Sequence, residues 1–164
     1  MTRCAKWLLV LALSGCGAPP PAPDASRPGP RVGTYDGRAV AVAYANGPRF
    51  AAWLRALRAA HDAAADRQDE AEMAALGGRA VAQQQRLHAQ TFEGADVDDI
   101  LELVAPELAG LCAAAGVVRL ERVNLARAAG VVTVDVTDRL VDLFEPSEKG
   151  RAWIRDLRAA PFPR

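Results

Sequence analysis

Two histidines, Cys112 and a group of aspartates are the side chains that could bind a metal ion or act in catalysis once the two N-terminal cysteines, considered below, are set aside. The pattern predicts a helical hairpin that turns near residues 67–68, which places His61 opposite about residue 74. His88 then lies roughly 21 Å farther along the arm. The two histidines cannot share a metal ion, so we expect no metal site, no cofactor and no catalytic residues.

The cysteine and the aspartates have structural explanations. Cys112 lies on the apolar face of a predicted helix, where it behaves as a small buried hydrophobic residue. Asp96, Asp98 and Asp99 could attract a cation or act as acid and base. Capping explains them more simply, because they stand at the start of a predicted helix, where carboxylates stabilise the first turn.

Four aromatic residues are the candidates for binding a ligand: Tyr35, Tyr44, Phe50 and Trp53. Phe50 and Trp53 recur at helical spacing, so both lie on one face of a helix. That face could line a ligand groove, although the same spacing is typical of an ordinary hydrophobic core.

The first fifteen residues have the pattern of a secretory signal. Arg3 and Lys6 precede an apolar run at residues 7–13, and no acidic residue is present. As a helix this run would span roughly 10 Å, against the ~30 Å of a bilayer core, so it is too short to cross a membrane.

The apolar run ends in Leu13-Ser14-Gly15-Cys16, which resembles the bacterial lipobox. The resemblance implies that the sulfur of Cys16 is diacylated and that the chain is cut just before it. Two or three acyl chains are enough for stable attachment to a bilayer. We therefore expect residues 1–15 to be removed and Cys16 to anchor the protein.

The segment that follows, residues 16–31, is expected to be an extended tether. Its composition cannot form a packed core, and proline favours the polyproline conformation, so it could hold a domain roughly 45 Å from the bilayer. Gly17 after the cysteine implies, by the sorting rule of such lipoproteins, the outer membrane facing the periplasm. The prolines of the tether are Pro19, Pro20, Pro21, Pro23, Pro28 and Pro30.

The remaining residues, 32–164, are long enough for one domain with its own core. The signal takes away two basic residues and no acidic one, so the mature chain has a net charge of about −2. It shows no basic stripe, and we expect no nucleic-acid partner. Because Cys4 leaves with the signal and Cys16 carries lipid, Cys112 has no partner for an internal disulfide.

The first half of this domain reads as a strand followed by helices. Residues 32–36 predict a strand, whereas residues 38–45 fit either its continuation or a brief helix that starts at Asp36-Gly37. After the break at Asn46-Gly47-Pro48, apolar residues at helical spacing predict the hairpin over residues 48–93. The two glycines at 77 and 78 should let its second arm bend or fray.

The second half predicts one helix over residues 97–115, with Asp96 as its cap, a kink or restart at Pro106 and a stop at Gly116. Alternating residues then predict two half-buried strands near 118–121 and 132–136, joined by a loop at 124–130. Two helices, opened by Thr137-Asp138 and Pro146-Ser147, complete the domain. We expect an α+β fold with a small mixed β-sheet, a short antiparallel helical hairpin and further packed helices.

This order of elements and the closing Val134-Asp135-Val136-Thr137-Asp138 resemble the OmpH/Skp family. Its members are periplasmic holdase chaperones, trimers whose helical arms surround unfolded outer-membrane proteins. The arms here would be short, about 30 Å, and residues 48–93 carry six basic and six acidic side chains where the family's arms are strongly basic. The resemblance implies a homo-oligomer, a trimer by analogy, that binds unfolded or other envelope proteins.

The sequence therefore predicts a lipid-anchored envelope protein that is not an enzyme and that acts as a chaperone or scaffold. The alternative is a ligand-binding lipoprotein with a pocket near Tyr35, Tyr44 and the closing strands. A hydrolase is the third candidate, and the lack of a coherent nucleophile and base weakens it.

Overall fold

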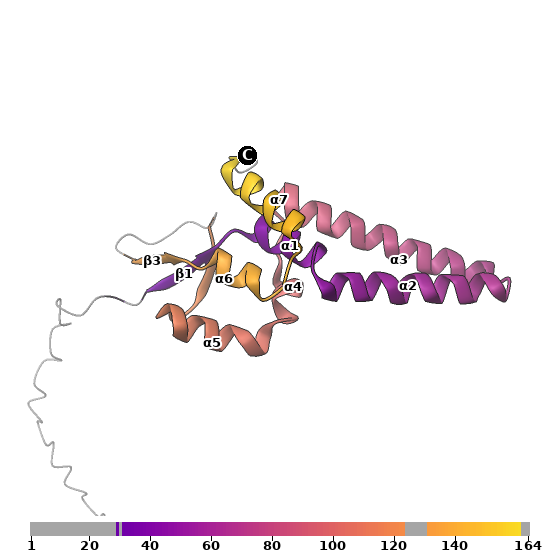
Figure 1. Ribbon diagram of the computed structural model, residues 1–164, viewed down its shortest axis with the longest axis horizontal. Coiled ribbons are helices and arrows are strands. Elements are labelled where there is room, and N and C mark those ends of the chain that lie inside the picture. Colours follow the sequence, from indigo (N-terminus) through magenta and orange to yellow (C-terminus); the bar gives the residue numbers. More distant parts are fainter. Residues whose placement is uncertain (1–28, 30, 124–130, 162–164) are drawn as a thin grey trace, which may run out of the picture.

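The computed structural model describes residues 29, 31–123 and 131–161 of the chain. The predicted signal, Cys16, almost all of the tether and the predicted loop at residues 124–130 lie outside these ranges. The described part is mostly helical and folds around a small sheet (Figure 1). Its elements, in chain order, are β1 (Val32–Tyr35), α1 (Gly37–Ala45), α2 (Pro48–Asp66), α3 (Glu70–His88), the π-helix η1 (Ala89–Glu93), α4 (Asp98–Glu102), α5 (Ala105–Ala115), β2 (Leu120–Arg122), β3 (Thr133–Asp135), α6 (Thr137–Asp142) and α7 (Glu148–Ala159).

The sheet has three strands in the order β2-β1-β3, and both outer strands run parallel to β1. Gly33 faces Leu120 in one register and Val134 in the other. The predicted mixed sheet is therefore wrong. The alternation of apolar and polar residues predicts half-buried strands, but it carries no information on the direction in which the strands pair.

Residues 38–45 form a helix, which decides between the two alternatives left open by the sequence. The carboxylate of Asp36 accepts a hydrogen bond from the backbone N–H of Arg38 and so caps α1. α1 contacts α2, α6, α7 and η1, and most of its side chains are buried. A helix covered on most sides is apolar nearly all round, which is why a simple amphipathic pattern is missing from its sequence.

Helices α2 and α3 lie side by side and leave the body together (Figure 1). We call this pair the arm and the rest of the described chain the body. Each helix has 19 residues, and residues 67–69 join them. The predicted short hairpin is wrong as stated: the arm contains the two longest elements of the fold. Gly77 and Gly78 do not interrupt α3, which is continuous through both. Both glycines face open space.

The predicted helix over residues 97–115 is divided into α4 and α5. The restart falls at Pro106, which stands in the first turn of α5, and Gly116 ends that helix with a φ of 63°. Asp98 and Asp99 occupy the first turn of α4 as expected. Asp96 is not the cap, because Val97 takes that position.

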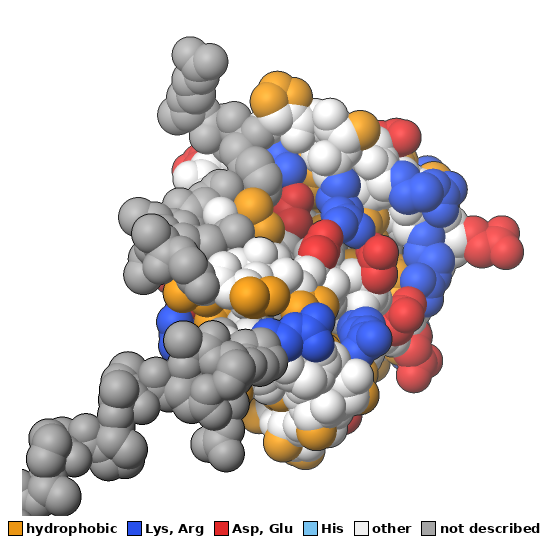
Figure 2. All heavy atoms as spheres, turned by 90° about the vertical axis from the view of Figure 1, so that its left-hand side faces the viewer, with side chains coloured by type: hydrophobic (Ala, Val, Ile, Leu, Met, Phe, Trp, Pro, Cys, Tyr) orange, Lys and Arg blue, Asp and Glu red, His pale blue; other side chains and the backbone are white. Residues whose placement is uncertain are grey.

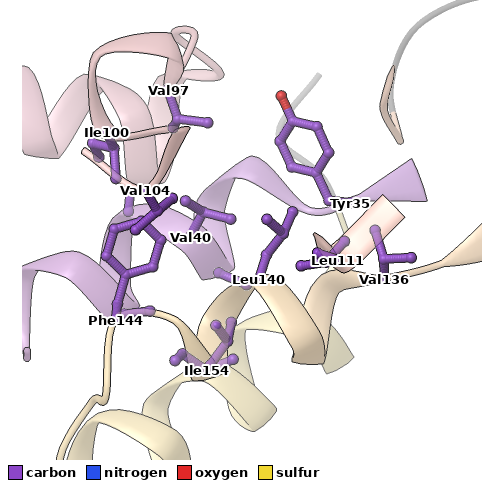
Figure 3. Close-up of a cluster of buried hydrophobic side chains, with 14 of the residues drawn as sticks. Tyr35, Val40, Val97, Ile100, Val104, Leu111, Val136, Leu140, Phe144 and Ile154 are labelled. Carbon is purple, nitrogen blue, oxygen red and sulfur yellow. The ribbon is translucent and has the colours of Figure 1, made fainter. Parts of the chain in front are cut away.

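The main core joins α1, the α4–α5 segment, α6 and α7 behind the sheet. Figure 3 shows Val40, Ile100, Val104 and Phe144 converging from different elements. Ser147 caps α7 by accepting from the N–H of Gly150, as its sequence predicted. The whole core lies within residues 32–161.

A second, much smaller cluster lies inside the arm. Its buried members are Leu57, Ala64 and Leu76. Trp53 and Met73 pack beside them and are only partly buried.

The end of the body that carries the sheet has a mixed surface. Figure 2 shows apolar areas there, interrupted by basic and acidic side chains. Val118, Val123 and Val132 flank the two outer strands and are exposed.

Candidate functional site

A mainly apolar groove of about 330 Å³ lies where the arm joins the body. It is bounded by the end of α1, by the α3–η1 segment and by α7, and we call it the root groove. Three of its residues are polar: Asn46, His88 and Thr91. The apolar ones are Val42, Ala45, Leu87, Phe92, Trp153 and Leu157.

Two large aromatic side chains of the root groove are exposed to solvent. Phe92 from η1 is 55% exposed and Trp153 from α7 is 49% exposed. The ring of His88 lies 5.1 Å from that of Phe92, and the Lys149 Nζ lies 4.8 Å from the centre of the Trp153 ring. Scattered exposed leucines are common in proteins, whereas two aromatic rings on one apolar groove are typical of a binding surface.

The π-helix explains why Phe92 reaches the surface. A regular α-helix through residues 70–93 would continue the apolar stripe of α3 toward Phe92. The wide turn of η1 rotates the side chains after His88 around the helix axis. Gln90 and Thr91 are buried as a result, and Phe92 is exposed. Single π turns of this kind are frequent at functional sites.

Three of the four aromatic candidates come together at the base of the arm. The Tyr44 and Phe50 rings lie 5.5 Å apart, and the Phe50 and Trp53 rings lie 5.4 Å apart and stack. Tyr44 also meets Phe144 at 6.2 Å. The contacts connect the body to the arm. Burial raises the pKa of Tyr44 above its usual value, and Asp99 adds to the effect.

Tyr35 lies apart from these three rings, in the main core. It is 5% exposed. Burial raises the pKa of its hydroxyl, Asp98 and Asp96 raise it further, and Arg122 acts in the opposite direction. Its ring is therefore part of the packing between the sheet and the helices of the body.

The residues that could have made a metal or catalytic site are dispersed. His61 and His88 are both exposed, on α2 and α3, and His88 Nδ1 lies 3.0 Å from a carboxylate oxygen of Glu93. Cys112 is a free, half-buried thiol that packs against the main core. Within residues 31–123 and 131–161, no group of three or more such side chains could hold a metal ion.

A buried ion pair that the sequence left unassigned ties the sheet to α1. Arg38 donates from Nε and Nη2 to the two oxygens of Asp36, at 3.1 and 2.9 Å. Its Nη1 donates to the backbone oxygen of Pro161, just after α7. The backbone N–H of Asp36 in turn donates to the hydroxyl oxygen of Thr137. This network joins the ends of β1 and α7 to the start of α6 and is structural.

The root groove itself could not have been found from the sequence. Trp153 and Leu157 are four residues apart, the spacing of an ordinary apolar helix face. Nothing in the local sequence indicates that α7 packs against α1. The exposure of Phe92 depends on a π turn that has no sequence signature.

Comparisons with known proteins give no match: no family model, no curated protein and no solved structure is similar to this chain. The resemblance to the OmpH/Skp family stays a prediction. No helix in the described part of the chain is long and apolar enough to span a bilayer.

Proposed function

We propose that this protein is a lipid-anchored scaffold or chaperone of the cell envelope that binds an apolar segment of another envelope protein in the root groove. The observation that carries the proposal is the pair of exposed rings, Phe92 and Trp153, on an apolar groove at the base of the arm. Aromatic anchors in a groove contribute most of the binding energy in many protein interfaces. The protein is not an enzyme under this proposal.

The anchor supports a local role at one membrane. A freely diffusing holdase would gain little from attachment, whereas a scaffold that meets its partners at a membrane benefits from it. The tether would give the body a reach of roughly 45 Å from the bilayer. Incorporation of labelled palmitate into the full chain, and its loss in Cys16→Ser, is the expected result. Equal labelling of both chains would contradict the anchor.

Aggregation of an unfolded β-barrel protein tests the binding role. Residues 32–164 should delay aggregation at a near-stoichiometric ratio, and the double variant Phe92→Ala/Trp153→Ala should abolish most of the delay. Both positions are about half exposed, so the variant is expected to fold. No delay by the unaltered domain would contradict the role.

A matched control uses apolar side chains that are exposed elsewhere. Leu103 and Val118 are 42% and 66% exposed, and neither lines the root groove. The double variant Leu103→Ala/Val118→Ala should delay aggregation as well as the unaltered domain. An equal loss in both double variants would mean that general surface hydrophobicity, and not the root groove, holds the client.

Self-association is part of the proposal. β2 and β3 each have three residues and pair with β1 on one side, so each has a free edge among the described residues. Exposed valines flank both strands. Light scattering on residues 32–164 should give a small oligomer, with a trimer expected from the family resemblance. A monomer at all concentrations would contradict this part.

A second candidate function is the binding of a small apolar molecule. The volume of the root groove, about 330 Å³, lies at the small end of the range of ligand pockets, roughly 300–1,000 Å³. Its three polar residues could orient such a ligand. Thermal shifts with a metabolite panel that are lost in Trp153→Ala, without any delay of aggregation, would favour this candidate.

A further inference from the structure

The charges of the arm are separated along its length. The part next to the body, residues 48–61 and 73–88, has five arginines and no acidic residue. The part at the tip, residues 62–72, has five acidic residues and one arginine. The equal numbers of basic and acidic side chains over residues 48–93 therefore hide a strong separation of charge.

One face of α2 carries this separation as a regular pattern. Arg55, Arg58, Asp62 and Asp66 follow one another at intervals of three or four residues, so their side chains share one side of the helix. We call these four residues the charge stripe. All four are exposed, whereas Leu57, which packs toward α3, is buried. The charge stripe lies on the side of α2 that is turned away from α3, on an arm that projects from the body (Figure 1).

The charge stripe is little paired within the chain. Among the described residues, Asp62 lies 3.9 Å from Nδ1 of its neighbour His61, and the other three members form no ion pair. Like charges also follow each other in the stripe, two arginines and then two aspartates, and such neighbours destabilise a helix. Opposite charges on a second molecule would relieve this repulsion.

The order of the charges identifies the partner. Along the chain the charge stripe reads plus, plus, minus, minus, so reversing its direction and inverting its signs reproduces it. A second copy of α2 that runs antiparallel would place Arg55 opposite Asp66 and Arg58 opposite Asp62. Each of these contacts would occur twice, because such a pair has two-fold symmetry. A parallel copy would place like charges opposite each other, so the stripe is complementary to itself in one direction.

The surface beside the charge stripe allows a second helix to come close. It consists of small side chains, so no long apolar group keeps the partner away from the charged ones. Their methyl groups add apolar area that the contact would remove from water. These residues, all exposed on α2, are Ala52, Ala56, Ala59 and Ala63.

We propose that two copies of this chain associate through an antiparallel contact of their α2 helices, with the two-fold axis near residues 60–61. The contact is separate from the strand edges and from the root groove, so it does not depend on the function proposed above. It places the two root grooves at opposite ends of the joined arms. Because the ion pairs are exposed, salt should weaken the contact.

Two variants of equal net charge test the order of the charges. Arg58→Asp/Asp66→Arg gives the order plus, minus, minus, plus, which places like charges opposite each other in the antiparallel pair. Arg58→Asp/Asp62→Arg gives plus, minus, plus, minus, which remains complementary. The altered positions are all exposed, so both variants are expected to fold, and circular dichroism checks this.

Sedimentation equilibrium at low salt measures the association of residues 32–164, which contain the whole core. The unaltered domain and Arg58→Asp/Asp62→Arg should associate alike, and about 1 M salt should weaken both. Arg58→Asp/Asp66→Arg should associate at least tenfold more weakly at low salt. Association through the strand edges would be the same in all three proteins. Equal association of the three, equal loss in the two variants, or a monomeric unaltered domain would overturn the proposal.

Discussion

The body and the arm are stabilised in different ways. Among the described residues, sixteen buried ones between positions 35 and 154 form the core of the body. In the arm three are buried, all from two consecutive helices. Regions with few buried apolar contacts open at lower free energy than the rest of a protein. The arm should therefore open on its own while the body stays folded, and the root groove lies at the boundary between the two.

The largest effect is expected from the buried ion pair of the body. Asp36→Asn leaves the guanidinium of Arg38 buried beside a neutral group, where both side chains are at most 7% exposed. Breaking such a pair costs about 3–5 kcal/mol. Denaturant unfolding should report a loss of this size.

The matched control is the exposed pair of Arg151 and Asp142, which meet at 2.7 Å. Asp142→Asn should lower the free energy of unfolding by less than about 1 kcal/mol, because exposed pairs contribute little. Similar losses in the two variants would argue against a special role of the buried network.

A smaller and local effect is expected in the arm. Leu76→Ala truncates the more buried of the two leucines in the small cluster between α2 and α3. The cost should be about 2 kcal/mol, near the low end for such changes because the cluster is open to solvent. Hydrogen exchange should accelerate in both arm helices and remain unchanged in β1 and α1.

Leu140→Ala, in the main core, should instead accelerate exchange throughout the described chain, since Leu140 is fully buried. If Leu76→Ala also accelerated exchange in β1, the arm and the body would be one cooperative unit.

Replacing a glycine by alanine should change the stability of the two regions in opposite directions. A Cβ at Gly77 or Gly78 meets nothing within 4 Å, so alanine at either position should stabilise the arm by about 1 kcal/mol. In the body, a Cβ at Gly47 would lie 2.3 Å from the backbone oxygen of Phe144, and Gly47→Ala should destabilise. Thermal unfolding of the three variants checks this, and a stabilising Gly47→Ala would contradict the close packing.

The smallest effect concerns alkaline pH. The pKa values of Tyr35 and Tyr44 are raised, mainly by burial, above the usual 10.0. The unfolded chain then loses these protons at lower pH than the folded one. Their contribution to stability is complete below pH 10 and is lost as the pH rises through the folded pKa values.

The arm, residues 48–88, contains no tyrosine, so this loss belongs to the body. Tyr35→Phe/Tyr44→Phe should flatten the fall of the unfolding free energy above about pH 10, the pKa of a free tyrosine. If the unfolding free energy of the double variant fell as steeply with pH, groups other than these tyrosines would cause the fall.

Local chemistry made part of this fold predictable. Pro48 after Gly47, Gly116 and Ser147 mark helix ends wherever they occur, because capping depends only on neighbouring backbone groups. The mixed sheet and the short hairpin were wrong. Strand direction depends on where the chain re-enters the sheet, and the lengths of α2 and α3 depend on whether exposed glycines interrupt them.

The candidate site was less predictable than the fold. Tyr44, Phe50 and Trp53 do meet, but they join the arm to the body. The exposed rings of the root groove are Phe92 and Trp153, which are not among the four aromatic candidates of the sequence. Their exposure follows from a π turn and from the packing of α7 on α1, which are tertiary features.

Hydrogen exchange with a bound client tests the proposed function most directly. Residues 32–164 would be measured alone and with a stoichiometric amount of an unfolded β-barrel protein. The proposal predicts slower exchange at the end of α1, in η1 and in α7, with β1 and the far ends of the arm helices unchanged. Protection confined to the tip of the arm near Gln68, or no protection anywhere, would contradict binding in the root groove.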